Sequence, residues 1–535
     1  MIVADYIVDF LIKRGVKRAY GYPGSLAGFV MDALRKRSGE IENHLLYTEQ
    51  ACGFAAIGDA LVSGVPTLCW ATSGPGAANL VTPIADAFHD SAPVIFLTAN
   101  VHTADSRERH GLTALRQNGN QELDITTIVR SITKFAARAE SAEELPQLLE
   151  QAWHAAVSGR KAPVLIDLPI DISRTLIAPR DQFSDQLIEP SESFTPRDFA
   201  LIAEMIAGAK QPIIIAGAGI TSAGVADEFR KWLERAVAAN PALRAVITLP
   251  AKDLLPCDHP LLLGVLGVWG HEAANEMVKT ADTIISFGSR LANRQLAPFG
   301  GTLPAGARLY RVDIDDAEFA RSVTSFPAQT ELIAADLRSF FRSAPQSLPC
   351  RVVVSDVGQN MWRVSRDLRV REGDRVIFSA GLGAMGFSLP AAIGAGYAAQ
   401  GAKIYAITGD GGLQMSLEEL HFLAQHRLAI TIVLLNNRSL GLIRAFQARN
   451  FDGEFFATTD GSGYAAPDFQ ALAKAFGIGY TLFNELHRET GGGGNTHSRQ
   501  SSRIGTCVCR RSPVRTAAPY RSVGRTYLPV KSQAA

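Results

Sequence analysis

The chain has 535 residues, of which 47% are hydrophobic and 20% charged, so it is too long for one hydrophobic core. At roughly 100 to 200 residues per domain we expect three or four domains. The 53 lysines and arginines nearly balance 52 aspartates and glutamates, six cysteines are scattered, and no apolar run is long enough for a membrane span. These properties argue against nucleic acid or a membrane as partner and favour a small molecule and a reducing cytoplasm.

Short apolar runs rich in β-branched residues recur along the chain between longer segments of helical periodicity. This alternation predicts an α/β fold of doubly wound parallel sheets, in which ligands bind at the carboxyl ends of the strands. Several runs end in glycine-rich turns, which are therefore candidate sites. The predicted strands are Pro66–Trp70, Pro93–Thr98, Pro163–Leu168, Pro212–Ala216, Thr283–Phe287, Ile404–Ile407 and Ile430–Leu435.

Two polar, proline-containing stretches are predicted to be linkers, Ala178–Arg197 and Phe340–Arg351. They give three predicted domains, at residues 1–177, 195–342 and 351–485. The remaining residues, 486–535, contain nine lysines and arginines, one acidic residue and a run of four glycines. We expect this basic tail to lie outside the domain cores, either as a solvated, disordered segment or as the product of a reading-frame change.

In the first domain, Glu49 lies between the glycine turns Gly21–Gly24 and Ser73–Gly76. Taken alone, a glutamate that starts an alanine-rich helix is an ordinary N-terminal charge. Its place between two such turns makes it a candidate catalytic group.

The strongest local pattern lies in the third domain. One predicted strand leads into Gly409-Asp410-Gly411, and another ends at Asn436-Asn437 about 25 residues later. A carboxylate and an amide oxygen suit Mg²⁺, which prefers oxygen ligands and keeps substrate phosphates among them. The glycines beside Asp410 would let the backbone approach a diphosphate, and a helix predicted from Ser416 would add its N-terminal dipole.

Together with further motifs, these patterns identify the chain as a member of the acetolactate synthase family of thiamine-diphosphate enzymes over about Val3 to Phe483. The resemblance implies a pyrimidine-binding, a central flavin-binding-like and a diphosphate-binding domain. It also implies thiamine diphosphate and Mg²⁺, 2-keto acid substrates, and a homodimer or homotetramer in which Glu49 of one subunit meets Asp410 of another. The further motifs are Thr72–Ala77, Asn79–Thr82, Arg130–Lys134, Pro163–Pro169, Phe287–Arg290, Asp356–Gln359, Gly381–Phe387 and Leu389–Ala392.

The resemblance also implies roles for single residues. Glu49 would hydrogen-bond the aminopyrimidine ring and relay a proton, close to the Gly24 turn. Met385 would prop the bent cofactor, and the Gly383 carbonyl would accept its amino group. Flavin binding, through Arg290, rests on the family alone. The implied Mg²⁺ ligands are Asp410, Asn437 and the Ser439 carbonyl, and the other implied cofactor contacts are Gly409, Gly411, Gly412 and Leu440.

The chain departs from the family pattern at the predicted substrate site. Ser25 follows the Pro-Gly turn as in benzoylformate decarboxylase, and Gln121 lies in a motif, Asn120-Gln121-Glu122, that has lost its apolar first residue. Phe446 stands where the family has tryptophan. Arg294 remains to clamp a carboxylate, but Ala292 and Asn293 replace its two acidic supports.

The favoured function is therefore decarboxylation of a 2-keto acid followed by carboligation to a second 2-keto acid. Two alternatives stay open. Ser25 favours a simple 2-keto acid decarboxylase, and the atypical tail makes a cofactor-binding homologue without turnover plausible. The presence of Glu49, Asp410 and Asn437 together argues against the second alternative.

Overall fold

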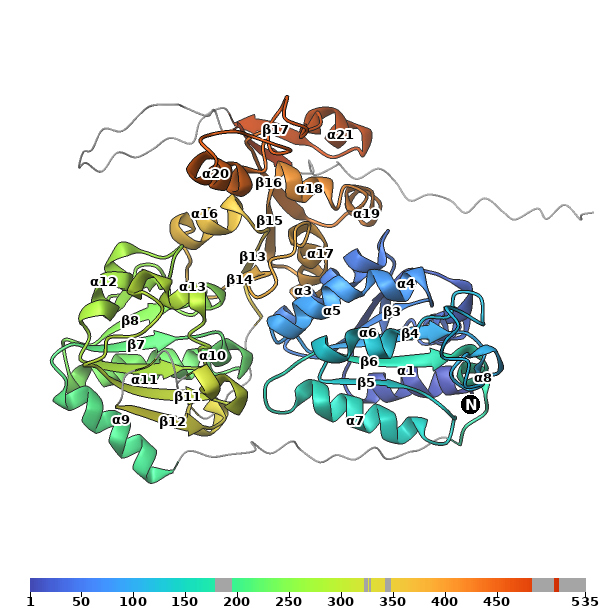
Figure 1. Cartoon of the computed structure of the whole chain (residues 1–535), viewed down its shortest axis with the longest axis horizontal. Helices are drawn as coiled ribbons and strands as arrows, with labels where there is room; N and C mark the ends of the chain where they lie inside the picture. The colour runs from blue at the N-terminus through green and yellow to red at the C-terminus, as the bar shows by residue number, and fades with distance from the viewer. Residues whose placement is uncertain (179–194, 322–325, 327–328, 342–347, 484–504, 510–535) are drawn as a thin grey trace, which may run out of the picture.

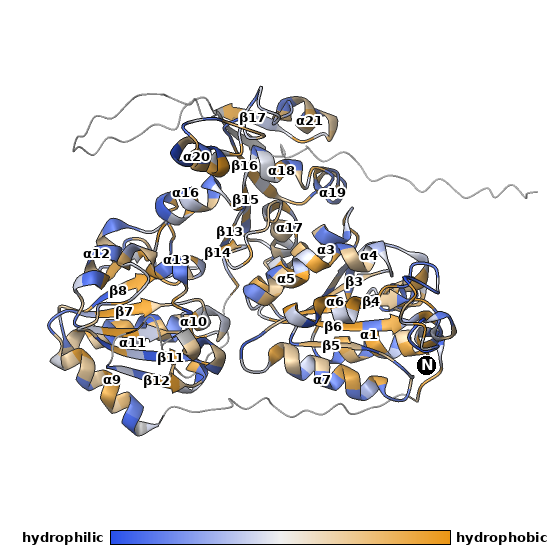
Figure 2. Cartoon of the chain, in the orientation of Figure 1, coloured by the Kyte–Doolittle hydropathy of each residue, from blue (hydrophilic) through white to orange (hydrophobic). Residues whose placement is uncertain are grey.

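The computed structural model describes residues 1–178, 195–321, 326, 329–341, 348–483 and 505–509. Three α/β domains follow one another along the chain, each built on a six-stranded sheet (Figure 1). Apolar side chains fill both faces of each sheet. Many strand residues are accordingly hydrophobic, and are coloured orange in Figure 2. The predicted α/β class with parallel sheets is confirmed. Within the described residues no helix is long and apolar enough to cross a membrane.

The N-terminal domain has a fully parallel sheet in the order β2-β1-β3-β4-β6-β5. Its central strands β3, β4 and β6 are buried on both faces, as their apolar sequences predict. The strands are β1 (Arg18–Gly21), β2 (Glu42–His44), β3 (Thr67–Ala71), β4 (Val94–Asn100), β5 (Phe135–Arg138) and β6 (Val164–Pro169). The helices are α1 (Val3–Lys13), α2 (Gly28–Lys36), α3 (Glu49–Ser63), α4 (Pro75–Asn79), α5 (Val81–His89), α6 (Ile125–Val129), α7 (Leu145–Val157) and α8 (Ile170–Arg174), with the 3-10 turn η1 at Ser25–Ala27.

The central domain is also fully parallel, in the order β12-β11-β10-β7-β8-β9. Its strands are β7 (Pro212–Ala216), β8 (Arg244–Ile247), β9 (Leu262–Val265), β10 (Thr283–Phe287), β11 (Arg308–Asp313) and β12 (Thr330–Ala334). Its helices are α9 (Pro196–Gly208), α10 (Gly219–Ser222), α11 (Ala226–Ala239), α12 (Glu272–Thr280), α13 (Asn293–Leu296) and α15 (Leu337–Phe341). Both predicted linkers run too far: Arg197 lies in α9, and Phe340 lies in α15, where its ring is buried in the domain core.

The C-terminal domain orders its sheet β14-β13-β15-β16-β18-β17. Its strands are β13 (Arg351–Ser355), β14 (Asp374–Phe378), β15 (Lys403–Gly409), β16 (Ile430–Asn436), β17 (Tyr480–Phe483) and β18 (Gly505–Cys509). Its helices are α16 (Gln359–Asp367), α17 (Ser388–Ala398), α18 (Asp410–Gln414), α19 (Glu419–His426), α20 (Gly441–Asn450) and α21 (Phe469–Ala475).

Strand β18 belongs to the segment 486–535, which we predicted to lie outside the domain cores. It pairs antiparallel with β16 and β17, so the prediction is wrong for these five residues. Strand pairing through the backbone explains the difference, because it needs no apolar pattern along the segment. The rest of the predicted tail, 486–504 and 510–535, lies outside the described residues.

Helices α3 and α17 make the closest contact between the N- and C-terminal domains. A Cβ atom on Gly58 would lie 2.0 Å from the carbonyl oxygen of Ala391, and a Cβ atom on Gly394 would lie 1.8 Å from that of Ala55. Both distances are to backbone atoms, which cannot rotate away. Around this crossing His44 stacks on Tyr397 with ring centroids 3.7 Å apart, and Phe54 meets Phe387 edge to face.

We predict that Gly394→Ala lowers the free energy of unfolding by about 1 to 3 kcal/mol, because the added methyl group forces the two helices apart. The matched control is Gly396→Ala on the same helix, where a Cβ atom would meet its nearest neighbour, Ile404, at an ordinary 3.7 Å. This control should leave stability unchanged or raise it slightly, because alanine favours helix more than glycine does. Thermal denaturation of both variants measures the difference, and equal melting temperatures would contradict the assigned contact.

Candidate functional site

Glu49 is the first residue of α3 and lies at the carboxyl-end edge of the N-terminal sheet. The Thr48 hydroxyl caps the helix by accepting a hydrogen bond from the backbone nitrogen of Ala51 at 3.1 Å. The Asn79 side chain, at the end of α4, donates to Glu49 Oε2 at 3.0 Å. A Cβ atom on Gly76 would lie 3.1 Å from Glu49 Oε1. The glycine turn after β3 therefore surrounds a half-buried carboxylate.

Gly24 and Gln121 lie against the same glycine turn. A Cβ atom on Gly24 would lie 2.3 Å from Thr72 Cβ, and one on Gly74 would lie 3.0 Å from Gln121 Cβ. Gln121 itself has a φ of 66°, a conformation that costs free energy for a residue with a side chain and is concentrated at functional sites. Ser25 begins the 3-10 turn η1 beside Gly24 and is exposed. The structure thus brings Gly24, Ser25, Glu49 and Gln121 to one edge of the domain.

Glu122 holds the loop that carries Gln121, a role that the sequence did not predict. Its buried carboxylate accepts hydrogen bonds from the backbone nitrogens of Arg107 and Asn118, both at 2.8 Å, and of Gly119 at 3.3 Å. Burial alone would raise the pKa of Glu122, but these backbone donors outweigh it and lower the pKa. Glu122 therefore stays charged and fixes the loop. The only sequence signal for this role of Glu122 is its position in the motif Asn120-Gln121-Glu122.

Asp410 lies at the end of β15 and starts the short helix α18. The predicted helix start at Ser416 is wrong, because a helical turn already begins at Asp410 and the next helix, α19, begins at Glu419. Asp410 as a whole is only 2% exposed, and its carboxyl group accepts a hydrogen bond from the Tyr464 hydroxyl at 2.8 Å. Burial raises the pKa of Asp410, and the bond from Tyr464 opposes this rise. No lysine or arginine in the described part of the chain pairs with this carboxylate.

The glycines around Asp410 have no room for side chains. A Cβ atom on Gly409 would lie 2.8 Å from Asn360 Nδ2, and one on Gly412 would lie 2.8 Å from Thr408 Oγ1. One on Gly411 would lie 2.7 Å from Leu440 Cδ2 and 3.2 Å from Met385 Cε. The predicted residues Met385, Gly411 and Leu440 therefore form one contact group beside Asp410.

Asn437 lies at the same sheet edge as Asp410, because β15 and β16 are parallel neighbours. Its Oδ1 accepts hydrogen bonds from the nitrogen and the hydroxyl of Ser439 at 3.1 and 3.3 Å. Its Nδ2 donates to Gln359 Oε1 at 3.0 Å, so the amide is oriented by the first residue of α16. The motif Asp356–Gln359 contained the signal for Gln359, whereas no local pattern marks Tyr464.

Asp356 fixes the loop that carries Gly383 and Met385. Its buried carboxylate accepts hydrogen bonds from the backbone nitrogens of Gly386 at 3.2 Å and Ser388 at 3.4 Å. Gly383, with a φ of 80°, donates its backbone hydrogen to Ser379 Oγ at 3.0 Å. The predicted cofactor contacts of the C-terminal domain thus lie on three loops at one edge.

The two residues predicted to bind substrate, Arg294 and Phe446, do not contact each other in the described chain. The Arg294 guanidinium lies over the Trp269 ring, 4.6 Å from its centroid, and Phe446 on α20 is 56% exposed. No contact joins these two side chains within the described residues. Arg290 lies elsewhere, in a cleft between the domains. Likewise, no hydrogen bond of the described chain joins Glu49 to Asp410 or Asn437.

Comparison with known proteins gives matches over nearly the whole chain. Three family models match, described as the N-terminal TPP binding domain (residues 1–128), the central domain (199–342) and the C-terminal TPP binding domain (356–490) of thiamine pyrophosphate enzymes. The chain is 32% identical to the acetolactate synthase isozyme 1 large subunit of Escherichia coli, covering 89% of this chain and 88% of that protein. It is also 32% identical to the acetolactate synthase large subunit of Lactococcus lactis (89% and 87%) and 30% identical to the probable acetolactate synthase large subunit of Methanocaldococcus jannaschii (89% and 86%).

We predict that Asp410→Ala weakens binding of thiamine diphosphate in the presence of Mg²⁺ at least tenfold, because it removes the one carboxylate among the three implied Mg²⁺ ligands. Asp460→Ala is the matched control, since Asp460 is exposed and pairs with Arg438 at the surface. Fluorescence titration with the cofactor measures both affinities. Equal affinities in the two variants would remove Asp410 from the metal site.

Proposed function

The chain belongs to the acetolactate synthase family of thiamine pyrophosphate enzymes, and on this premise we propose that it decarboxylates one 2-keto acid and joins the product to a second. The observation that carries the proposal is a pair of residue groups, one around Glu49 and one around Asp410 and Asn437. Each lies at the carboxyl-end edge of the sheet in a family-matched domain. When bound, thiamine diphosphate supplies the carbanion-stabilising centre that such decarboxylation and carboligation require.

The C-terminal edge fits the diphosphate end of the cofactor. We propose that Asp410, Asn437 and the Ser439 carbonyl hold Mg²⁺. The support is a buried carboxylate whose charge burial disfavours, with a directed amide beside it and no cationic side chain paired to it in the described residues. Because Gly409, Gly411 and Gly412 carry no side chains, phosphate oxygens could approach their backbone closely. Met385 and Leu440 would form the apolar wall against which the rest of the cofactor lies. The Gly383 carbonyl would accept a hydrogen bond from the cofactor's amino group.

At the N-terminal edge Glu49 would hold or move the proton of the aminopyrimidine ring. Asn79 fixes its orientation, and Gly24 lets the turn after β1 pack against Thr72 beside it. We propose that two copies of the chain complete the site, as a homodimer or a homotetramer. The absence of a bond between Glu49 and Asp410 within the described residues of one chain supports this proposal. We also propose a cytoplasmic location for the protein and the domain bounds 1–177, 195–342 and 351–485.

A second candidate, simple decarboxylation, is favoured by one specific observation. Arg294, which would clamp the carboxylate of the second keto acid, stacks on Trp269, and within the described residues no acidic side chain pairs with it. Ala292 and Asn293 precede it. Ser25 and Gln121 add polar groups to the turn beside Glu49, and Phe446 leaves more space than tryptophan. We therefore expect slower use of the second keto acid than in relatives with both acids.

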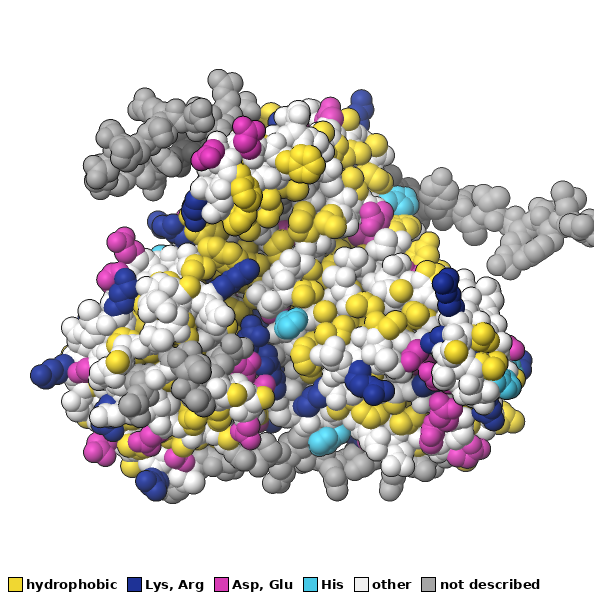
Figure 3. All heavy atoms as spheres, in the orientation of Figure 1, with side chains coloured by type: hydrophobic (Ala, Val, Ile, Leu, Met, Phe, Trp, Pro, Cys, Tyr) yellow, Lys and Arg dark blue, Asp and Glu magenta, His cyan; other side chains and the backbone are white. Residues whose placement is uncertain are grey.

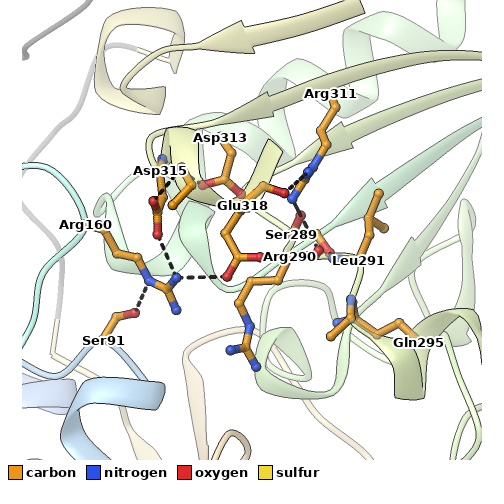
Figure 4. Close-up of polar contacts among 12 residues, drawn as sticks. Ser91, Arg160, Ser289, Arg290, Leu291, Gln295, Arg311, Asp313, Asp315 and Glu318 are labelled. Atoms are coloured by element: carbon orange, nitrogen blue, oxygen red, sulfur yellow. Dashed lines mark hydrogen bonds and ion pairs between the residues drawn. The ribbon is translucent and has the colours of Figure 1, made fainter. Parts of the chain in front are cut away.

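A cleft of about 520 Å³ between the domains fits a flavin nucleotide. Figure 3 shows lysine and arginine side chains gathered between the two lower domains. Arg160 of the N-terminal domain pairs with Asp315 at 2.9 Å and Glu318 at 3.1 Å, whereas Arg290 extends from the end of β10 past this network (Figure 4). Gly219, Gly288 and Asp313, at the carboxyl ends of β7, β10 and β11, line the same cleft. We propose that FAD binds here, with Arg290 on its phosphates.

The proposed function is tested by incubating purified protein with thiamine diphosphate, Mg²⁺ and a panel of 2-keto acids, and identifying products by mass spectrometry. We expect release of CO₂ that depends on the cofactor, and formation of a hydroxy-keto acid alongside some aldehyde. Aldehyde alone would favour the simple decarboxylase. No CO₂ release from any 2-keto acid, with the cofactor shown to be bound, would overturn the proposal.

We predict that Arg290→Ala lowers the flavin content of the purified protein at least fivefold, because a phosphate loses its charge-assisted bonds. Arg308→Ala, on the same domain at an exposed strand end, is the matched control. Visible absorbance after reconstitution with FAD measures both. Full flavin content in Arg290→Ala would show that the flavin, if bound, does not use this cleft.

A further inference from the structure

A second cleft, of about 830 Å³, lies between the central domain and α16 of the C-terminal domain. We call it the Lys252 cleft. It contains none of the residues that we assign to thiamine diphosphate, Mg²⁺, flavin or keto acid. Its wall is formed by Ile247, Lys252, Cys257, Leu262, Leu263, Gly264 and His271 of the central domain and by Trp362, Arg363, Arg366, Asp367, Leu368 and Arg369.

Lys252 is the most unusual residue of this wall, because its ammonium group is buried and no carboxylate in the described part of the chain pairs with it. The residue is 4% exposed, and its one hydrogen-bond partner in the described chain is Cys257 Sγ, at 4.0 Å. Burial lowers the pKa of Lys252, and the neighbouring Cys257 side chain and Asp367 carboxylate oppose this only in part. A buried charge without an opposite charge is destabilising, so a bound anion would compensate it.

The other charged residues of the cleft wall are also mainly positive. Arg363, Arg366 and Arg369 come from the end of α16 and the turn after it, and Asp367 is the one carboxylate of the lining. Arg363 lies 3.7 Å from Asp367 and so offsets that charge. His271 adds no charge, because burial lowers its pKa and its Nδ1 accepts a hydrogen bond from Val265 at 3.0 Å. The cleft therefore carries a clear excess of positive charge.

Apolar and aromatic groups share the wall with these cations. Ile247, Leu262 and Leu263 line the central-domain side, and the partly exposed Trp362 ring lies on the other side with Arg366 5.4 Å from its centroid. The volume is within the roughly 300 to 1,000 Å³ typical of small-molecule sites. Such a wall suits a ligand with both an anionic and an aromatic or apolar part.

We propose that the Lys252 cleft binds a phosphorylated small molecule with an aromatic part, of the size of a nucleoside diphosphate, at a site separate from the cofactor. Lys252 and the arginines of α16 would bind the phosphates, and Trp362 with the leucines would contact the ring. The site is not isolated from the cofactor edge. Helix α16 lines the cleft with its last turns, and its first residue, Gln359, orients the amide of Asn437.

The test uses the full-length protein saturated with thiamine diphosphate, Mg²⁺ and FAD, so that the sites proposed above are filled, and titrates it with ADP by calorimetry. We expect binding that weakens at least tenfold in Lys252→Met, while adenosine, which lacks phosphates, binds no better than buffer. Lys279→Met, at an exposed lysine of α12 that pairs with Glu276, should bind ADP as the unchanged protein does. Lys252→Met should also raise the melting temperature without ADP, because it removes an uncompensated buried charge.

Equal ADP affinity in Lys252→Met and the unchanged protein would overturn the proposal, as would absence of ADP binding at millimolar concentration. Loss of ADP binding in Arg290→Ala but not in Lys252→Met would place the nucleotide in the flavin cleft and also overturn it. If Lys252→Met does not fold, the double variant Arg366→Gln with Arg369→Gln, at two exposed positions, gives the same comparison. None of these readouts depends on catalysis, so they stay valid if the proposed activity fails.

Discussion

The arrangement of the candidate site depends on the crossing of α3 and α17. Gly58 and Gly394 let the two helix backbones touch, and no side chain at either position would fit without moving a carbonyl group. Both helices begin at the site: Glu49 is the first residue of α3, and Met385 lies in the loop that leads into α17. Within each chain, the contact that joins the two domains therefore also fixes how far the Glu49 group lies from the Met385 loop. In the proposed assembly these two groups belong to different sites.

Burial raises the pKa of two carboxyl groups near the crossing of α3 and α17. The carboxyl group of Glu419 on α19 is fully buried and accepts a hydrogen bond from the backbone nitrogen of Tyr47 at 3.0 Å, two residues before Glu49. Burial raises the pKa of Glu419 to about 8, so this group is mostly neutral at physiological pH. Asp90 at the end of α5 accepts hydrogen bonds from Ala380 and Gly381, and burial raises its pKa to about 6. A neutral carboxyl group such as that of Glu419 can pack between domains at lower cost than a carboxylate. Asp90 stays mostly charged at physiological pH, and its two backbone donors stabilise that charge.

The sequence predicted the strands well where apolar runs stand between turn residues, as at Pro212–Ala216 and Thr283–Phe287, because buried parallel strands need little else. It also predicted that Asp410 and Asn437 share an edge, since both follow strands of one parallel sheet. It missed the helical turn at Asp410, where three glycines disfavour helix and only tertiary contacts explain it. Tyr464 was missed because its hydrogen bond to Asp410 joins a loop to the start of α18, 54 residues earlier in the chain. The strand Gly505–Cys509 was missed because it is short and lies within a segment rich in arginine and glycine.

The central claim is that the Glu49 group of one copy works with the Asp410 group of another. Coexpression of Glu49→Gln and Asp410→Ala chains tests it most directly. A mixed dimer would contain one site with both substitutions and one with neither, so random assembly should restore about a quarter of the unchanged activity, although each variant alone is nearly inactive. Activity of the coexpressed mixture no greater than that of the two single variants, with mixed dimers shown by mass spectrometry, would contradict the account.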